Sequence, residues 1–344
     1  MMSFLARRNT RVGAIGLLVG LALAVVIPFL PGIGQGSGLF ALTACAIYSL
    51  AALAAGILYG RLGLVSLMQI ALVAVGGWVT LRLYYATDLP FELVAVAAAV
   101  VTALIGALLS LPALKLSGLS LAIVTLMIAG GIQVVITATG FPNGGTGFLG
   151  RLPAGTVPDT MPRPTWGASD DAYFRYVAVV VAVVFLAVWW LLSSRVGRAW
   201  AAIRQGEAGA ITLGIPVTRY RILALLITSF ITGLSGALLA ANTGVLDSTG
   251  TTFSAQQSVL LFATVLIGGT FSLSGAVIGG IFFYGVPVLL QAWGVSGDLV
   301  FIILGLGTIQ AITTNPIGIA GSVAALARRW RTPRRASRAR EVTA

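Results

Sequence analysis

The chain has 344 residues, of which 58% are hydrophobic and only 9% are charged, and its formal net charge is +12 at pH 7. A soluble globular domain carries roughly 25% charged residues, so this composition excludes an ordinary soluble fold. The sequence contains no histidine, which excludes histidine metal sites and Ser-His-Asp triads, and its single cysteine, Cys45, excludes an intrachain disulfide.

Apolar blocks of about 20 residues, the length that crosses a bilayer as a helix, recur along the chain. They predict an all-α, polytopic transmembrane helical bundle of about ten helices, organised as one membrane domain over residues 1–327. The predicted helices span residues 13–31, 38–59, 63–86, 91–110, 118–140, 173–193, 221–243, 256–270, 275–292 and 299–315. The first is expected to be an uncleaved membrane helix rather than a signal peptide. The segment 256–270 is short for a full span, and we expect it to be tilted, broken or re-entrant.

The basic residues predict how the chain is oriented. If both termini are cytoplasmic and the helices alternate in direction, only four of the 21 basic residues lie outside, namely Arg82, Arg151, Arg163 and Arg175. This distribution obeys the positive-inside rule. We therefore expect a multi-pass protein of a bacterial-type cytoplasmic (inner) membrane, whose positive charge reflects orientation and not nucleic-acid binding. The basic tail, residues 328–344, is expected to lie on anionic lipid at the cytoplasmic surface.

Two hydrophilic segments interrupt the apolar blocks. Residues 141–172 form a glycine- and proline-rich loop, predicted to be extracytoplasmic. Residues 194–220 lie in a stretch with five arginines, and a single arginine at the bilayer centre costs about 2.5–3.5 kcal/mol, so this segment is predicted to be cytoplasmic. Its pattern favours a short helix that ends near Gly214 and Pro216. Such a helix must pack either on the chain's own helices or on a soluble partner, and both remain open.

The second hydrophilic segment also carries a resemblance. SRVGRAWAAIRQGEAGAITLGI, within that segment, resembles the cytoplasmic loop of ABC importer permeases of the branched-chain amino acid type, in particular their LivM-like subunits. Further blocks resemble the family in the same order, namely GRLGLVSLMQIALVAVGGW (60–78), LSGLSLAIVTLMIAGGI (116–132), PNGGTGF (142–148), VLIGGTFSLSGAVIGG (265–280) and NPIGIAG (315–321). Met68 departs from the family, which has a glycine before the residue matched by Gln69.

The resemblance implies a permease subunit of an ATP-driven importer, which forms the path for branched-chain amino acids or similar small polar solutes such as urea and amides. The implied partners are a second permease subunit, two ATPase subunits, an extracytoplasmic solute-binding protein and the lipid bilayer. The sequence has no Gly-x-x-x-x-Gly-Lys-Ser/Thr phosphate loop. We therefore expect a chain that is not an enzyme and holds no cofactor, with ATP and Mg bound by the partner ATPases.

Three groups of candidate residues follow. The predicted ATPase-coupling residues are Arg198, Trp200, Ile203, Arg204, Glu207 and Gly214. Arg204 and Glu207 are expected to share one helix face, and Trp200 and Ile203 another. The predicted translocation-path residues are Ser66, Gln69, Thr125 and Gln133. For Gln69 and Gln133, hydrogen bonding between helices is an alternative role. Gly144, Gly145 and Gly147 are predicted to serve an outer gate or docking loop, with ordinary turn geometry as the alternative.

Other functions compete with this interpretation. A sugar permease of the same superfamily would share the architecture. An ion-coupled secondary transporter usually keeps ionisable residues within the membrane, whereas Glu92 and Asp298 lie near the ends of predicted helices. An intramembrane enzyme is disfavoured because the sequence shows no catalytic constellation.

Overall fold

The computed structural model describes residues 37–112, 116, 118–153, 156–246, 252–314 and 318–322, and every regular element within these ranges is helical. The predicted helix 13–31 and the basic tail 328–344 lie outside the described residues. Six helices are long and apolar enough to cross a membrane, so the described part of the chain is a polytopic helical bundle. Two shorter apolar helices, Ala255–Gly268 and Gly297–Gln310, accompany them, and the predicted number of about ten spans is not established.

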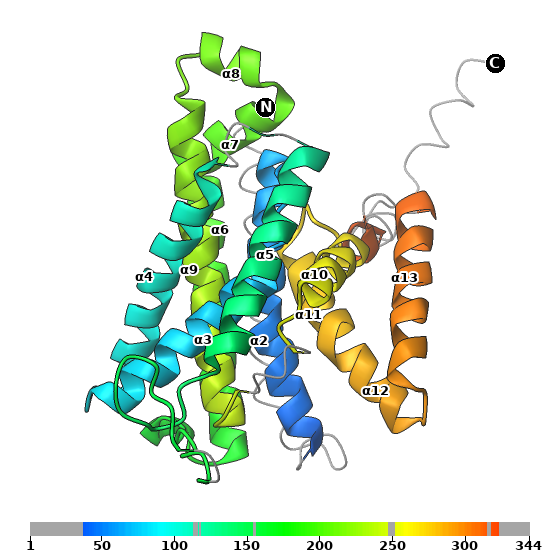
Figure 1. Ribbon diagram of the computed structural model, residues 1–344. Coiled ribbons are helices and arrows are strands. Elements are labelled where there is room, and N and C mark those ends of the chain that lie inside the picture. Colours follow the sequence, from blue (N-terminus) through cyan, green and yellow to red (C-terminus); the bar gives the residue numbers. More distant parts are fainter. Residues whose placement is uncertain are drawn as a thin grey trace, which may run out of the picture.

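The elements follow one another in the order shown in Figure 1, and a long connection joins α5 to α6. Their bounds are α2 Ser37–Ile57, continued by a π-helical turn Leu58–Leu62, α3 Gln69–Ala86, α4 Phe91–Ser110, α5 Leu119–Thr139, α6 Asp170–Ser193, α7 Arg195–Gln205, α8 Glu207–Thr212, α9 Val217–Thr243, α10 Ala255–Gly268, α11 Leu273–Gly280, a second π-helical turn Ile281–Gly285, α12 Val286–Ala292 and α13 Gly297–Thr314. A 3-10 turn, Thr165–Gly167, precedes α6.

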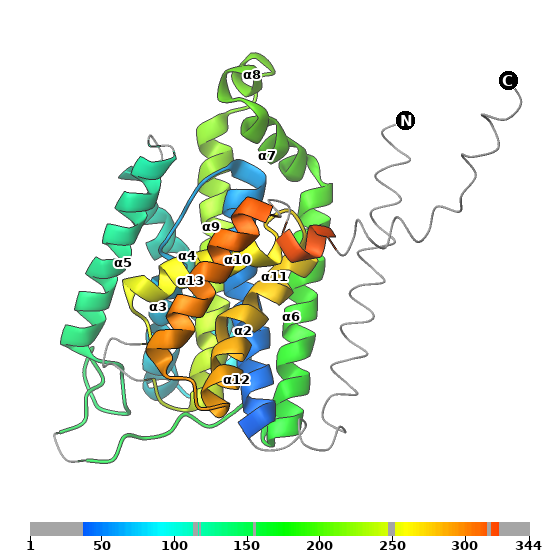
Figure 2. The same cartoon turned by 90° about the vertical axis from the view of Figure 1, so that its right-hand side faces the viewer.

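Small residues bring the central helices together. α9 packs along α3 and α4, and α2 packs against α9, α6 and α11. A Cβ on Gly76 of α3 would lie 2.4 Å from the carbonyl oxygen of Gly233 in α9, and one on Gly236 would lie 2.1 Å from that of Val73. In lipid the hydrophobic effect does not drive helices together. Van der Waals contact between backbones that approach this closely drives their association instead. Figure 2 shows this core between α5 at one edge and α6 at the other.

The predicted helix 63–86 is wrong in its first six residues. Gly63 ends the preceding π-helical turn with φ 73°, in the left-handed region that glycine favours, and its amide bonds to the Tyr59 carbonyl. The chain then runs without helix through residues 63–68, and α3 begins at Gln69. The Leu67 amide donates to the Thr125 hydroxyl at 3.0 Å instead of to a helical carbonyl. The helical path is thus broken between α2 and α3, and this break lies against α5, inside the bundle.

α10 spans only part of the bundle, as its short apolar block suggested. Its 14 residues correspond to about 21 Å of helix, against about 30 Å of hydrocarbon. It begins beside α5, where the Ala255 amide donates to Gln133 Oε1 at 2.9 Å. It ends at Gly269, whose φ of 107° turns the chain into α11. The carbonyl oxygen of Thr270 in this turn lies 2.0 Å from where a Cβ of Gly60 would stand, so Gly60 allows the turn to reach the end of α2.

The two hydrophilic segments lie at opposite ends of the bundle. Figure 1 shows α7 and α8 at the top and the connection between α5 and α6 at the bottom. Arg204 of α7 bonds to the carbonyl of Tyr59, so the C-terminal end of α2 and the segment between α6 and α9 lie at the same end of the bundle. This arrangement agrees with the predicted alternation of helices, whereas the assignment of that end to the cytoplasm stays a prediction.

Cysteine labelling tests that assignment. Val157 in the α5–α6 connection is 85% exposed, Leu213 after α8 is 74% exposed, and the native Cys45 is buried at 5%. In intact cells, a cysteine at position 157 is expected to react with a membrane-impermeant maleimide, and one at position 213 only after permeabilisation. The parental chain, with Cys45 alone, is the control for background. The reverse labelling pattern would show that the chain is inverted.

Candidate functional site

The segment between α6 and α9 forms two short helices rather than the single predicted one. Ser194 caps α7 by accepting from the Val196 amide at 3.1 Å, and α7 ends at Gly206. α8 follows from Glu207 to Thr212. Gly214 then adopts φ 74° and closes α8 with a hydrogen bond from its amide to the Ile211 carbonyl at 2.9 Å. A side chain would strain this left-handed position, so Gly214 has a structural role here.

α7 is anchored to the bundle by its apolar face. Trp200 is fully buried, and its indole nitrogen donates to the Tyr220 carbonyl at 3.0 Å. Ile203 is only 4% exposed. The predicted contact of these two side chains with a partner is therefore corrected, because they contact the chain's own helices. Of the two alternatives, the chain's own helices or a soluble partner, α7 therefore packs on the chain's own helices.

Arg204 joins the end of α7 to two other elements. Its guanidinium donates to the Tyr59 carbonyl at 2.6 Å and to the Gly60 carbonyl. It also lies over the Phe271 ring, 4.6 Å from the ring centroid, in the turn between α10 and α11. Carbonyls at a helix end carry partial negative charge, so the arginine suits the end of the α2 helix electrostatically. This arrangement replaces the expected pairing of Arg204 with Glu207.

Glu207 pairs instead with Arg221, at the start of α9. The distance between Glu207 Oε2 and Arg221 Nη2 is 2.8 Å, and the side chains are 52% and 13% exposed respectively. A partly exposed ion pair of this kind contributes about 0–1 kcal/mol to stability. The pair fixes α8 relative to α9 while half of the Glu207 side chain stays accessible.

The outward face of α8 carries a feature that the sequence reasoning missed. Glu207, Ala208 and Gly209 are exposed, and so are two large apolar side chains, Ile211 at 60% and Leu213 at 74%. We call these five residues the α8 surface. The sequence signal for this face is a pair of large apolar residues, Ile211 and Leu213, within a hydrophilic segment. In the structure, α8 buries the small Ala210 and leaves these two exposed. Exposed apolar side chains rimmed by polar groups are typical of interaction sites.

Arg198 is exposed on α7 and donates to the Ser193 carbonyl at 3.3 Å.

The predicted path residues Ser66 and Thr125 meet in one small pocket. Its wall combines three hydroxyls, one guanidinium and leucines: Leu64, Ser66, Ser110, Leu121, Thr125, Arg221 and Leu225. We call it the polar pocket. Arg221 therefore faces both the polar pocket and Glu207 of the α8 surface. Gln69 and Gln133 do not line it.

Two glutamines on neighbouring helices have different surroundings. Gln133 accepts a hydrogen bond from the Ala255 amide, so it connects α5 to α10 as the alternative role predicted. Gln69 is 2% exposed, and neither its amide oxygen nor its amide nitrogen has a hydrogen-bond partner among the described residues. A buried polar group without a partner costs about 1–3 kcal/mol, so Gln69 is retained at a cost to stability.

The predicted outer-loop glycines lie in an ordered turn. The Gly145 amide donates to the Gly150 carbonyl at 3.1 Å, and the Asn143 side chain accepts from the Leu152 amide at 2.7 Å. Gly144 and Gly147 have φ of 98° and 79°, and a Cβ on Gly145 would lie 2.0 Å from the Arg151 carbonyl oxygen. The turn itself therefore requires these glycines, as the alternative interpretation held.

Comparison with known proteins identifies relatives of the chain. The profile of the family described as branched-chain amino acid transport system / permease component matches residues 38–311. The high-affinity branched-chain amino acid transport system permease protein LivM of Salmonella typhimurium is 28% identical over 77% of this chain and 65% of its own length. LivM of Escherichia coli is 28% identical over 76% of this chain and 64% of its own. The chain thus spans just under two thirds of these relatives.

Sugar permeases match over shorter stretches. The fructose import permease protein FruG of Bifidobacterium longum is 28% identical over 40% of this chain and 42% of its own length. No solved structure matches the chain.

Proposed function

The chain belongs to the family of branched-chain amino acid transport system permease components, and from this membership we propose that it is the membrane-spanning permease subunit of an ATP-driven importer. The family is one of transporter components, not of enzymes. The observation that carries the proposal is the α8 surface, which presents Ile211 and Leu213 to solvent on a segment joined to the bundle by Trp200 and Arg204.

The proposed partners follow from this division of labour. An ATPase subunit binds the α8 surface, and a second permease subunit brings a second ATPase. An extracytoplasmic solute-binding protein delivers the solute to the end that carries the α5–α6 connection. ATP and Mg are held by the ATPases, this chain holds no cofactor of its own, and nucleic acid is not a partner. In this arrangement the membrane is the bacterial cytoplasmic membrane, and both termini are cytoplasmic.

The connection between Glu207 and Arg221 suggests how movement of the ATPase reaches the path. A displacement of α8 pulls on Arg221 through their ion pair at 2.8 Å. Arg221 lines the polar pocket with Ser66 and Thr125, so its movement changes the pocket's wall. In parallel, Arg204 links α7 to the end of α2 and to the α10–α11 turn. Through Arg221 and Arg204, motion of the α7–α8 segment thus reaches both the polar pocket and the end of α2.

The proposed solute is a branched-chain amino acid or a similar small polar compound such as urea or an amide. The LivM relatives align over about three quarters of this chain, and the sugar permease over less than half. The polar pocket has room for little more than one water molecule, so the solute assignment rests on the LivM relatives and not on this pocket. Gln69, buried and without a partner, offers the amide group that a passing solute would meet deeper in the bundle.

A sugar permease remains the second candidate, because sugar and autoinducer 2 import permeases also match this chain. Competition between leucine and fructose for uptake separates the two candidates.

Uptake by reconstituted vesicles tests the proposal. The importer, isolated through a tag on this chain, is expected to move labelled leucine only with ATP, Mg and a solute-loaded binding protein. The chain alone is expected to hydrolyse no ATP and to move no solute. Uptake by the chain alone, driven by a sodium or proton gradient, would establish an ion-coupled carrier and overturn the proposal.

A further inference from the structure

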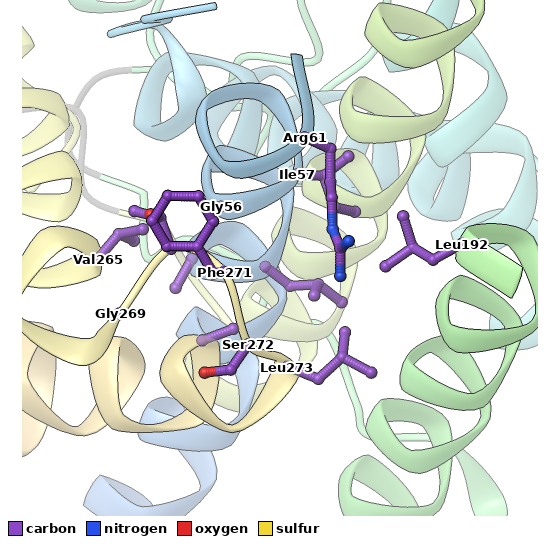
Figure 3. Close-up of a pocket in the computed structure, with 13 residues that line it drawn as sticks. Gly56, Ile57, Arg61, Leu192, Val265, Gly269, Phe271, Ser272 and Leu273 are labelled. Carbon is purple, nitrogen blue, oxygen red and sulfur yellow. The ribbon is translucent and has the colours of Figure 1, made fainter. Parts of the chain in front are cut away.

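A second pocket lies at the end of the bundle that carries α7 and α8, and it belongs neither to the α8 surface nor to the polar pocket. The end of α2, the end of α6 and the α10–α11 turn enclose it, through Ala52, Leu53, Gly56, Ile57, Arg61, Leu192, Val265, Gly269, Thr270, Phe271, Ser272, Leu273 and Ala276. Figure 3 shows the Arg61 side chain extending from the end of α2 toward Leu273, with Leu192 of α6 beside it.

Arg61 is the charged residue of this wall, and its charge has no counterpart there. The lining contains no carboxylate. The ion pairs of Arg163 with Asp170 and of Glu207 with Arg221 do not involve Arg61. Arg61 also has no hydrogen bond to another described residue, and it is partly buried. The neighbouring Arg204, bonded to the Tyr59 carbonyl, adds to the positive potential at this end.

The position of the pocket along the membrane normal selects the kind of anion. Arg61 lies one residue before the end of its π-helical turn, Leu192 one residue before the end of α6, and Leu273 begins α11. Arg61 and Leu192 each lie one residue before the end of a helix long enough to cross the membrane, Gly38–Leu62 and Asp170–Ser193, where a guanidinium reaches lipid headgroups. The rest of the wall is mostly apolar, with the hydroxyls of Thr270 and Ser272 in the α10–α11 turn. Basic pockets between transmembrane helices at such a level bind anionic headgroups.

From this juxtaposition we propose that the pocket binds one anionic phospholipid, with its phosphate on Arg61 and its acyl chains along Leu192 and Leu273. A guanidinium presents several N–H donors to phosphate oxygens, which are the partners that Arg61 lacks. Leu192 and Leu273 offer an apolar contact to an acyl chain, whereas a free, hydrated anion has no group that would make this contact.

Native mass spectrometry of the full-length chain tests this proposal. The detergent-solubilised protein is titrated with phosphatidylglycerol and, separately, with phosphatidylcholine of the same chain length. The parental protein is expected to bind one phosphatidylglycerol in preference to phosphatidylcholine. Arg61→Gln is expected to weaken that binding by about fivefold or more, the factor that corresponds to about 1 kcal/mol for one basic residue near a membrane surface. Arg198→Gln, an exposed arginine outside the pocket, is the matched control and is expected to bind as the parent does.

Two further arms make the result decisive. Leu192→Glu places a carboxylate in the wall while Arg61 remains, and it is expected to lose phosphatidylglycerol preference even if Arg61→Gln does not fold. Millimolar inorganic phosphate is expected not to displace the lipid. Unchanged phosphatidylglycerol binding by the two pocket variants would overturn the proposal. Displacement of the lipid by inorganic phosphate would also overturn it, because the site would then belong to a soluble anion.

Discussion

Leu213→Asp is expected to abolish ATP-driven uptake while the membrane bundle stays folded. Leu213 is 74% exposed, so its replacement should change the free energy of unfolding by no more than about 0.5 kcal/mol. In a complex, the same position would bring an unpaired carboxylate into an apolar contact. A buried carboxylate without a partner costs several kcal/mol, and a loss of about 2 kcal/mol already corresponds to about 30-fold in affinity for the ATPase.

The measurement is copurification of the ATPase with the tagged chain, together with uptake in vesicles. Val157→Asp is the matched control for ATPase copurification, because Val157 is also an exposed aliphatic residue but lies in the α5–α6 connection at the other end of the bundle. Ile211→Asp is expected to behave as Leu213→Asp does. If Leu213→Asp retained its ATPase and transported at the parental rate, the α8 surface would not be the docking site.

The second large effect is expected at Arg204. Arg204→Met removes the guanidinium that bonds to the Tyr59 carbonyl and lies over Phe271, yet it leaves the α8 surface intact. Hydrogen bonds to a charged group contribute about 1.5–3 kcal/mol, so the link between α7 and the end of α2 would weaken by roughly tenfold or more. We therefore expect an importer that still binds its ATPase and hydrolyses ATP, and whose uptake per ATP falls at least about tenfold.

The ratio of uptake to ATP hydrolysis is the quantity to measure. Arg219→Met serves as the control, because Arg219 is an exposed arginine in the first turn of α9 and is not one of the predicted coupling residues. An unchanged ratio in Arg204→Met would mean that the Arg204 link does not transmit movement. A loss of ATPase binding in this variant would instead place Arg204 in the docking surface.

The sequence predicted those features of the fold that depend on the length and polarity of a segment. The apolar blocks gave α4, α5 and α6 within a few residues, and the charges placed the two hydrophilic segments at opposite ends. Membership of the permease family, which the resemblance implied, is confirmed. These features follow from the cost of polar groups in lipid, which every residue of a block shares.

Features that depend on one particular contact were not predictable in the same way. Residues 63–68 are apolar enough to read as helix, and two local features explain why they form none: the left-handed Gly63 and the contact between the Leu67 amide and Thr125. Likewise Arg204 and Glu207 have helical spacing, but the break at Gly206 lets each find a partner 14 or more residues away. Trp200 and Ile203 were assigned to a partner because periodicity shows that a face is apolar and not what it packs against.

Site-specific photocrosslinking tests the central claim, that ATP-driven movement enters this chain at the α8 surface. A photoreactive amino acid is placed at position 213 in the assembled importer, and the same amino acid at position 157 is the control on the opposite end. The account predicts that illumination joins position 213 to the ATPase subunit, that position 157 gives no such product, and that ATP changes the yield at position 213. An ATPase that crosslinks elsewhere on the chain, with none formed at position 213, would contradict it.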